Sequence, residues 1–116
     1  MAIPRLQIFA PSSVTIAYAS SITPNCENSD TINVGELTGA LTVNAPTGAK
    51  VDGQNLRFRF DQDATGRVIT WDAAFAFGTD ITSALVPSTA NAKFEIMFTW
   101  HAGDSKWRAV SIIRGF

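Results

Sequence analysis

The chain has 116 residues, of which 46% are apolar, and its formal net charge is -1. This length suits one domain with its own core, and the apolar content argues against wholesale disorder. The 9 basic residues form no stripe that would bind nucleic acid, and residues 1–10 are too short and too interrupted by Pro4 and Arg5 to span a membrane. Cys26 is the single cysteine, so no disulfide can form within the chain. We expect a complete product made in the cytoplasm, without a signal peptide.

Residues 1–12 are predicted to form an extended N-terminal arm, because Pro4 and Pro11 disfavour helix. The arm is apolar, and its candidate binding residues are Ile3, Leu6, Ile8 and Phe9. Two interpretations stay open. The arm is either an edge strand of its own domain or a segment that packs on a neighbouring subunit or a larger surface. An exposed apolar arm would otherwise be a liability.

Residues 13–116 are predicted to form one all-β domain, a single antiparallel β-sandwich that is jelly-roll-like. Helical periodicity is almost absent, whereas Thr, Val, Ile and Phe runs alternate with turn residues. This rhythm is typical of a sandwich or barrel of antiparallel strands. The expected strands are 14–19, 31–35, 39–44, 56–61, 67–71, 93–101 and 107–113, with a short eighth strand at 74–77.

Residues 52–71 contain two alternating runs that we interpret as the strands of a β-hairpin. In the first run, apolar side chains at 56, 58 and 60 alternate with Arg57 and Arg59. Successive side chains of a strand point to opposite faces, so the apolar ones should be buried and the arginines should face outward. The two arginines are therefore candidate contacts with a neighbouring protein.

The end of this hairpin resembles a calcium-binding loop in spacing. Asp61, Asp63 and Asp72 fall at positions 1, 3 and 12 of the calcium-loop template, around Gly66. No helices flank the segment, and Asp/Gly turns are common for conformational reasons alone. We expect a plain turn here and no bound metal; these three aspartates are the residues that would hold one.

No residue pattern predicts catalysis. His101 is the only histidine, and its neighbour Asp104 is explained by turn chemistry. Cys26 lies in a polar loop without a nearby Lys or Arg to activate it. We expect no catalytic residues and no cofactor.

The aromatic residues are the remaining candidates for a site. Trp71 and Trp107 each lie at a strand end, where they could form a platform for stacking against a sugar. Most aromatic residues fall on inward-facing strand positions, however, and core packing is the expected role. Burial of Trp71 and Trp107 would count against a carbohydrate-binding function.

Residues 38–113 resemble a small β-sandwich domain of tailed-bacteriophage virion proteins. The resemblance is carried by Pro46, a D-G-Q turn at 52–54, Q-D-A-T-G at 62–66, T-W at 70–71 and Trp107 in the final hairpin. Such domains occur in tail fibres, in head fibres and in capsid decoration proteins. They are typically structural and often trimeric, and the resemblance implies no catalytic residues.

The resemblance implies a structural protein of the phage virion, made in the host cytoplasm. Because no fibrous stem is visible, we expect a capsid decoration protein that forms a homotrimer and binds the major capsid protein or other virion proteins. The arm residues, Arg57 and Arg59 would make these contacts. The alternative is a tail-fibre domain or a receptor- or carbohydrate-binding tip. No nucleic acid or membrane partner is expected.

Overall fold

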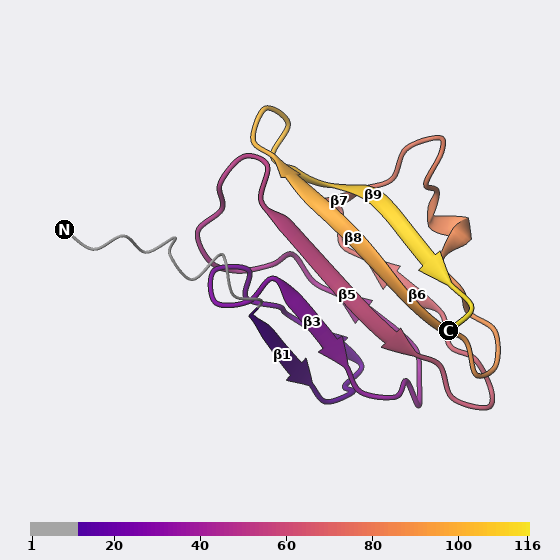
Figure 1. Ribbon diagram of the computed structural model, residues 1–116. Helices are drawn as coiled ribbons and strands as arrows, with labels where there is room; N and C mark the ends of the chain where they lie inside the picture. The colour runs from indigo at the N-terminus through magenta and orange to yellow at the C-terminus, as the bar shows by residue number, and fades with distance from the viewer. Residues whose placement is uncertain (1–11) are drawn as a thin grey trace.

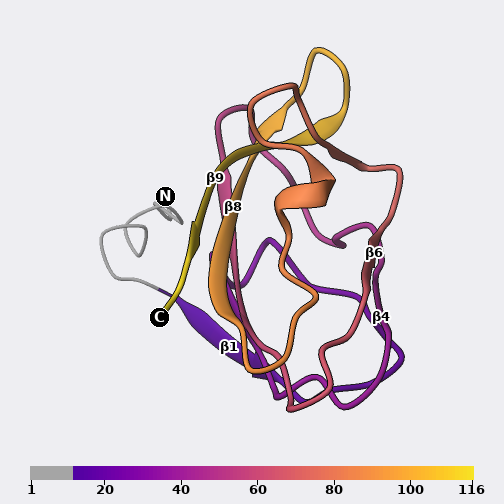
Figure 2. The same ribbon diagram turned by 90° about the vertical axis from the view of Figure 1, so that its right-hand side faces the viewer.

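A computed structural model describes residues 12–116, which form two β-sheets packed face to face (Figures 1 and 2). The larger sheet has the strand order β1-β3-β5-β8-β9-β7, and the smaller has the order β2-β4-β6. A 3-10 helix, η2 (Ser83–Leu85), lies between β7 and β8. The strands are β1 (Ser13–Ile16), β2 (Ser21–Ile22), β3 (Thr31–Val34), β4 (Leu41–Val43), β5 (Asn55–Asp61), β6 (Ile69–Trp71), β7 (Phe75–Ala76), β8 (Lys93–His101) and β9 (Lys106–Arg114).

The predicted all-β sandwich is confirmed, and a strand occurs at each of the eight expected places. The strand β2 was not predicted, because two residues are too few to show an alternating pattern. The prediction for β8 matches its observed bounds, whereas β1 ends at Ile16, three residues before the predicted end.

The strand pairing differs from the antiparallel, jelly-roll-like arrangement expected from the sequence. Strands β1, β3 and β5 pair in parallel, and so do β2, β4 and β6. Only the β5-β8-β9 part of the larger sheet is antiparallel, while β7 pairs with β9 in parallel. From β1 to β6 the chain alternates between the two sheets, so it winds as a coil whose turns stack on one another. Turn residues mark where strands end but not which strands pair.

The β-hairpin predicted at residues 52–71 is wrong. β5 pairs with β3 and β8, whereas β6 joins β4 in the other sheet. The two runs face each other across the core, where the Trp71 ring lies 5.5 Å from that of Phe58 and 5.9 Å from that of Phe60. Alternation identifies the buried face of a strand, and that face is the same whether its partner lies beside it or opposite it.

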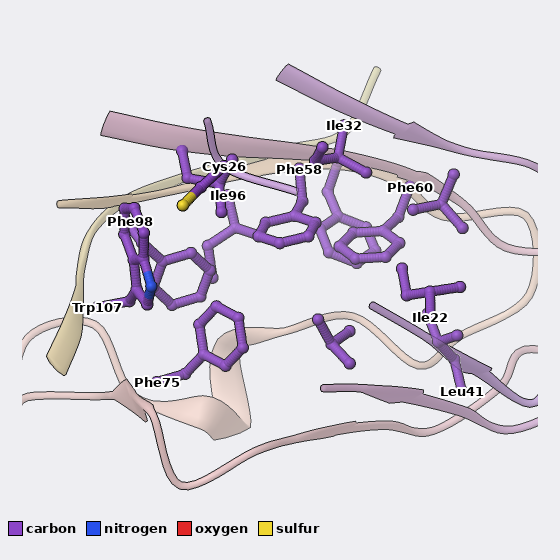
Figure 3. Close-up of a cluster of buried hydrophobic side chains, with 14 of the residues drawn as sticks. Ile22, Cys26, Ile32, Leu41, Phe58, Phe60, Phe75, Ile96, Phe98 and Trp107 are labelled. Atoms are coloured by element: carbon purple, nitrogen blue, oxygen red, sulfur yellow. The ribbon is translucent and has the colours of Figure 1, made fainter. Parts of the chain in front are cut away.

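The core is filled by aromatic side chains from both layers (Figure 3). Phe58 lies at its centre and has ring contacts with Phe60, Trp71, Phe75 and Phe98 at 5.5–6.0 Å. Phe58 is 0% exposed and Phe60 is 1% exposed, so the predicted inward face of β5 is confirmed. Burying each such side chain stabilises the fold by about 2–3 kcal/mol.

The predicted N-terminal arm falls almost entirely on residues that the structure does not describe. Its four candidate residues, Ile3, Leu6, Ile8 and Phe9, lie outside residues 12–116. Their role therefore stays a prediction. Within the described range, no helix is long and apolar enough to cross a membrane.

Candidate binding surface at the sheet tip

One end of the larger sheet carries a group of polar and aromatic side chains, here called the tip surface. It is formed by Lys50, Asp52, Trp100, His101, Asp104 and Arg108, from the turn at 50–54 and the β8–β9 turn (Figure 1). The two turns are held together by backbone hydrogen bonds. The Gly53 N–H donates to the Trp100 carbonyl oxygen at 2.8 Å, and the Trp100 N–H donates to the Gln54 carbonyl oxygen at 2.8 Å.

Trp100 is the aromatic side chain of the tip surface. Its ring is half-buried, and it packs on the fully buried Trp107 with ring centroids 5.3 Å apart. The Lys50 ammonium lies 5.6 Å from the centre of the Trp100 ring, within the range of a cation–π interaction. Strand alternation places Trp100 on the inward row of β8, and the β8–β9 turn projects past the ends of β4 and β6 (Figure 2). The Trp100 side chain remains partly accessible.

The β8–β9 turn adds charged groups beside this ring. Asp104 accepts hydrogen bonds from the Arg108 guanidinium at 2.8 Å, and its other oxygen lies 3.1 Å from His101 Nδ1. The Arg108 hydrogen bond, followed by that of His101, lowers the pKa of the Asp104 carboxyl below 3.8. Asp52 accepts a hydrogen bond from the Ala102 N–H at 2.9 Å and so links the two turns.

The tip surface combines an anchored aromatic face with carboxylate, imidazole and guanidinium groups. Trp and Arg dominate the binding energy of many protein interfaces, and polar groups around an aromatic face give specificity. The arrangement is therefore suited to a polar ligand such as a glycan or a protein loop. Trp100 is not among the candidates from the sequence, because its inward position in the alternation of β8 indicates a core residue.

The two arginines predicted to face outward lie on the outer face of the larger sheet, away from the tip surface. Arg57 and Arg59 both approach Glu95 on β8, with nitrogen–oxygen distances of 3.8 and 3.5 Å. Their side chains are 43% and 46% exposed. The predicted outward orientation is confirmed, and their role as subunit or capsid contacts stays a prediction.

The calcium-loop pattern is not assembled by the fold. Asp61 pairs with Lys93 at 3.5 Å, Asp63 pairs with Arg67 at 2.9 Å, and Asp72 accepts from the Ala74 N–H. Asp72 follows β6 in the other sheet, so it does not close a loop around the first two carboxylates. Across residues 12–116, no group of three or more His, Cys, Asp or Glu side chains is placed to hold a metal.

The Q-D-A-T-G turn, residues 62–66, is instead closed on itself by hydrogen bonds. The side chain of Gln62 is buried; its Oε1 accepts from the Arg67 N–H at 2.7 Å, and its Nε2 donates to the carbonyl oxygens of Arg67 and Pro87. Asp63 accepts from the N–H groups of Thr65 and Gly66 at 3.0 Å each. The Arg67 side chain, as the largest cause, and these N–H groups lower the pKa of the Asp63 carboxyl.

The two tryptophans considered for a sugar platform are not available for one. Trp107 is 0% exposed, and Trp71 packs against the core with its indole nitrogen buried. The hypothesis that these two residues form a platform for stacking against a sugar is therefore wrong. A strand end in the sequence does not show whether the opposite sheet covers it.

The two residues considered for catalysis have other roles in the structure. His101 forms its contact with Asp104 within one turn, three residues along the chain. Cys26 is 3% exposed, and its Sγ lies 3.2 Å from the Thr47 carbonyl oxygen. Burial is the main reason why the pKa of the Cys26 thiol is raised above 9.0, which makes the reactive thiolate scarce at neutral pH.

Comparison with protein families gives a match over residues 22–104 to the family described as "Putative phage tail fibre C-terminal domain". The match covers more than half of the chain and includes the strands β3 to β8, the Q-D-A-T-G turn and most of the tip surface. The chain belongs to this family. No curated protein matches the chain.

Membership of this tail fibre family makes the chain a domain of a structural protein associated with the phage virion. It agrees with the resemblance on which the sequence prediction rested. The tail-fibre alternative fits the family better than the capsid decoration role that the sequence analysis favoured. The capsid decoration role was expected because no fibrous stem is visible in the sequence. A fibre's C-terminal domain can be recognised without its stem, so this feature does not separate the two roles.

Proposed function

We propose that this protein is a tail-fibre domain whose role is binding and structural rather than catalytic. The single observation that carries the proposal is the family match over residues 22–104. A sandwich with a densely packed aromatic core suits a virion part, because it keeps its shape outside the cell without a disulfide.

The tip surface is the proposed contact with the host cell. Trp100 is anchored on Trp107 and presents part of its ring, so binding does not have to immobilise a free side chain. Asp104 and Arg108 hold each other in place and keep exposed polar edges beside the ring. A host-surface glycan or protein loop would stack on Trp100 and hydrogen-bond to these charged groups.

Self-association, as a homotrimer attached to other virion proteins, is the second part of the proposal. A single small sandwich leaves the edges of its sheets unpaired, and association with copies of itself protects them. The outer face around Arg57, Arg59 and Glu95 offers charged groups for further contacts within the virion.

Electron microscopy of virions labelled with gold-conjugated antibodies against this domain tests the location. We expect gold particles on the tail fibres. Gold on the head, with none on the tail, would contradict the tail-fibre assignment.

The host contact is tested by competition between the purified protein and virions for adsorption to host cells. Trp100→Ala should raise the protein concentration needed for half-inhibition about 30-fold. This corresponds to a loss of about 2 kcal/mol of binding free energy for a central aromatic anchor. Val68→Ala, at a residue 62% exposed and far from the tip surface, is the matched control and should inhibit like the unmodified protein. Circular dichroism checks that Trp100→Ala remains folded, and equal inhibition by a folded Trp100→Ala variant would refute the tip as the contact.

A further inference from the structure

The larger sheet has an unpaired edge along most of β9. β7 covers only Trp107 and Arg108 of this strand, and the remaining edge is residues 109–114. In the described part of the chain, no backbone hydrogen bond reaches this edge from the outer side. On its other side, β9 pairs with β8 along its whole length.

Strand geometry shows which backbone groups the edge presents. The Gly115 N–H points toward β8, since it donates to the Lys93 carbonyl oxygen. Backbone groups of a strand alternate in direction, so those of Ile112 and Arg114 point away from β8, to the open side. Such an edge is a template for one more strand.

A groove of about 900 Å³ runs beside the C-terminal part of this edge. The connection between η2 and β8 forms its other wall. The end of β9 and the residues after it contribute two exposed apolar side chains, Ile113 at 56% and Phe116 at 66%, together with the exposed cation Arg114. Lys93, on the groove wall, is paired with Asp61 at 3.5 Å. The open backbone edge and the exposed apolar side chains favour an extended segment that carries apolar side chains.

Residues 5–10, R-L-Q-I-F-A, have the required properties. They lie between Pro4 and Pro11, which cannot donate a backbone hydrogen bond, so six residues are free to pair with the six residues 109–114. In an extended course, Leu6, Ile8 and Ala10 share one face. Residues 6–10 carry no charge.

The segment cannot enter the groove of its own chain. β1 begins at Ser13 on one edge of the sheet, and a strand added to β9 would lie five strand spacings away (Figure 1). Five spacings of about 4.8 Å amount to about 24 Å. Ala10 and Ser12 are two residues apart, which spans at most about 7 Å.

We therefore propose that residues 5–10 of one copy add as a strand to the β9 edge of a second copy. Each copy donates one segment and accepts another at a different place, so the interface is head-to-tail, and it gives a ring when the rotation between copies closes. The inference rests on the self-association proposed above and gives it a defined contact; a ring of three copies fulfils the predicted trimer. It does not depend on whether the domain lies in the tail.

The first test measures the mass of the full chain in solution by light scattering after gel filtration. We expect a mass three times that of the 12.5 kDa chain. The double variant Leu6→Asp/Ile8→Asp and the groove variant Ile113→Asp should each be monomeric. The matched controls Ala2→Asp, outside the paired segment, and Val68→Asp, at a residue 62% exposed just before β6, should stay trimeric.

The outcomes of this test are distinguishable. Trimers in both the arm and groove variants would overturn the strand exchange while leaving self-association standing. A monomeric unmodified chain would overturn both proposals without touching the tail-fibre assignment. Circular dichroism of each variant separates loss of association from loss of fold.

The second test identifies the contact directly and does not need a destabilising variant. A chain with Ile8→Cys is mixed, under oxidising conditions, with chains carrying a cysteine in place of Val110, Ser111 or Ile113. At least one mixture should give a disulfide-linked pair, and the mixture with Val68→Cys should give none. Native Cys26 does not interfere because it is buried. No linked pair in any of the three mixtures would refute the proposed contact.

Discussion

The Q-D-A-T-G turn and the tip surface lie at opposite ends of β5 and contain the same ion pair in different surroundings. Asp63 pairs with Arg67 at 2.9 Å, and Asp104 pairs with Arg108 at 2.8 Å, each four residues apart. The side chain of Asp63 is 15% exposed and that of Arg67 is 30% exposed. The corresponding values for Asp104 and Arg108 are 41% and 52%.

The difference separates a structural turn from a binding surface. Around Asp63, the hydrogen-bonding groups of Gln62 and of the backbone already have partners within the fold. Around Asp104, half of each polar side chain still faces solvent beside Trp100. A motif that identifies a family can therefore be a device of folding, while binding lies in residues that the motif does not contain.

The largest expected effect is on stability, and it distinguishes Gly66 in the Q-D-A-T-G turn from Gly53 beside the tip surface. Gly66 has a φ of 81°, and a Cβ there would meet the Ser88 carbonyl oxygen and lie 2.8 Å from the Thr89 carbonyl carbon. Gly53 has a similar φ of 84°, but no atom lies within 4 Å of its added Cβ. Gly66→Ala should lower the free energy of unfolding by about 3–4 kcal/mol, and Gly53→Ala by about 1 kcal/mol. Urea unfolding measures both, and equal losses would contradict the closed turn.

A smaller contrast is expected between two glutamines. Gln62→Ala leaves the backbone groups of Arg67 and the Pro87 carbonyl oxygen without their partner, which should cost about 2–3 kcal/mol. Gln54 is half-buried and bonds the Cys26 carbonyl oxygen and the Val51 N–H. Gln54→Ala should cost about 1 kcal/mol, since water can replace its contacts. A larger loss of unfolding free energy for Gln54→Ala than for Gln62→Ala, measured by urea unfolding, would contradict the more closed structure of the Q-D-A-T-G turn.

The smallest expected effect is a difference in acid sensitivity. The pKa of both Asp63 and Asp104 is lowered by the paired arginine, so each carboxylate stays charged in the folded protein below its ordinary value of 3.8. As the pH falls below about 4, the unfolded chain takes up these protons first, so the stabilisation is complete above that pH and lost below it.

Asp63→Asn should weaken this acid dependence more than Asp104→Asn, because solvent screens the exposed Asp104 pair more strongly. Thermal unfolding midpoints between about pH 6 and about pH 2 measure the effect. Identical acid dependence in the two variants would show that burial does not separate the pairs.

Much of the strand content and the inward faces followed from the sequence alone. The alternation of Phe58 and Phe60 with Arg57 and Arg59 fixed which side of β5 is buried, because side-chain direction alternates in any strand. The same reasoning located β8 at residues 93–101. The tail-fibre alternative also rested on sequence, through turn and core residues that all lie in the matched range except Trp107.

Only the tertiary structure decided how these strands pair and which polar residues meet. The coil from β1 to β6 puts Trp71 opposite Phe58 instead of beside it, and it separates Asp72 from Asp61. The fold also buries Trp107 completely while leaving Trp100, its partner across β8 and β9, partly exposed. Local sequence specifies a strand and its faces, whereas pairing and coverage depend on contacts between residues far apart in the chain.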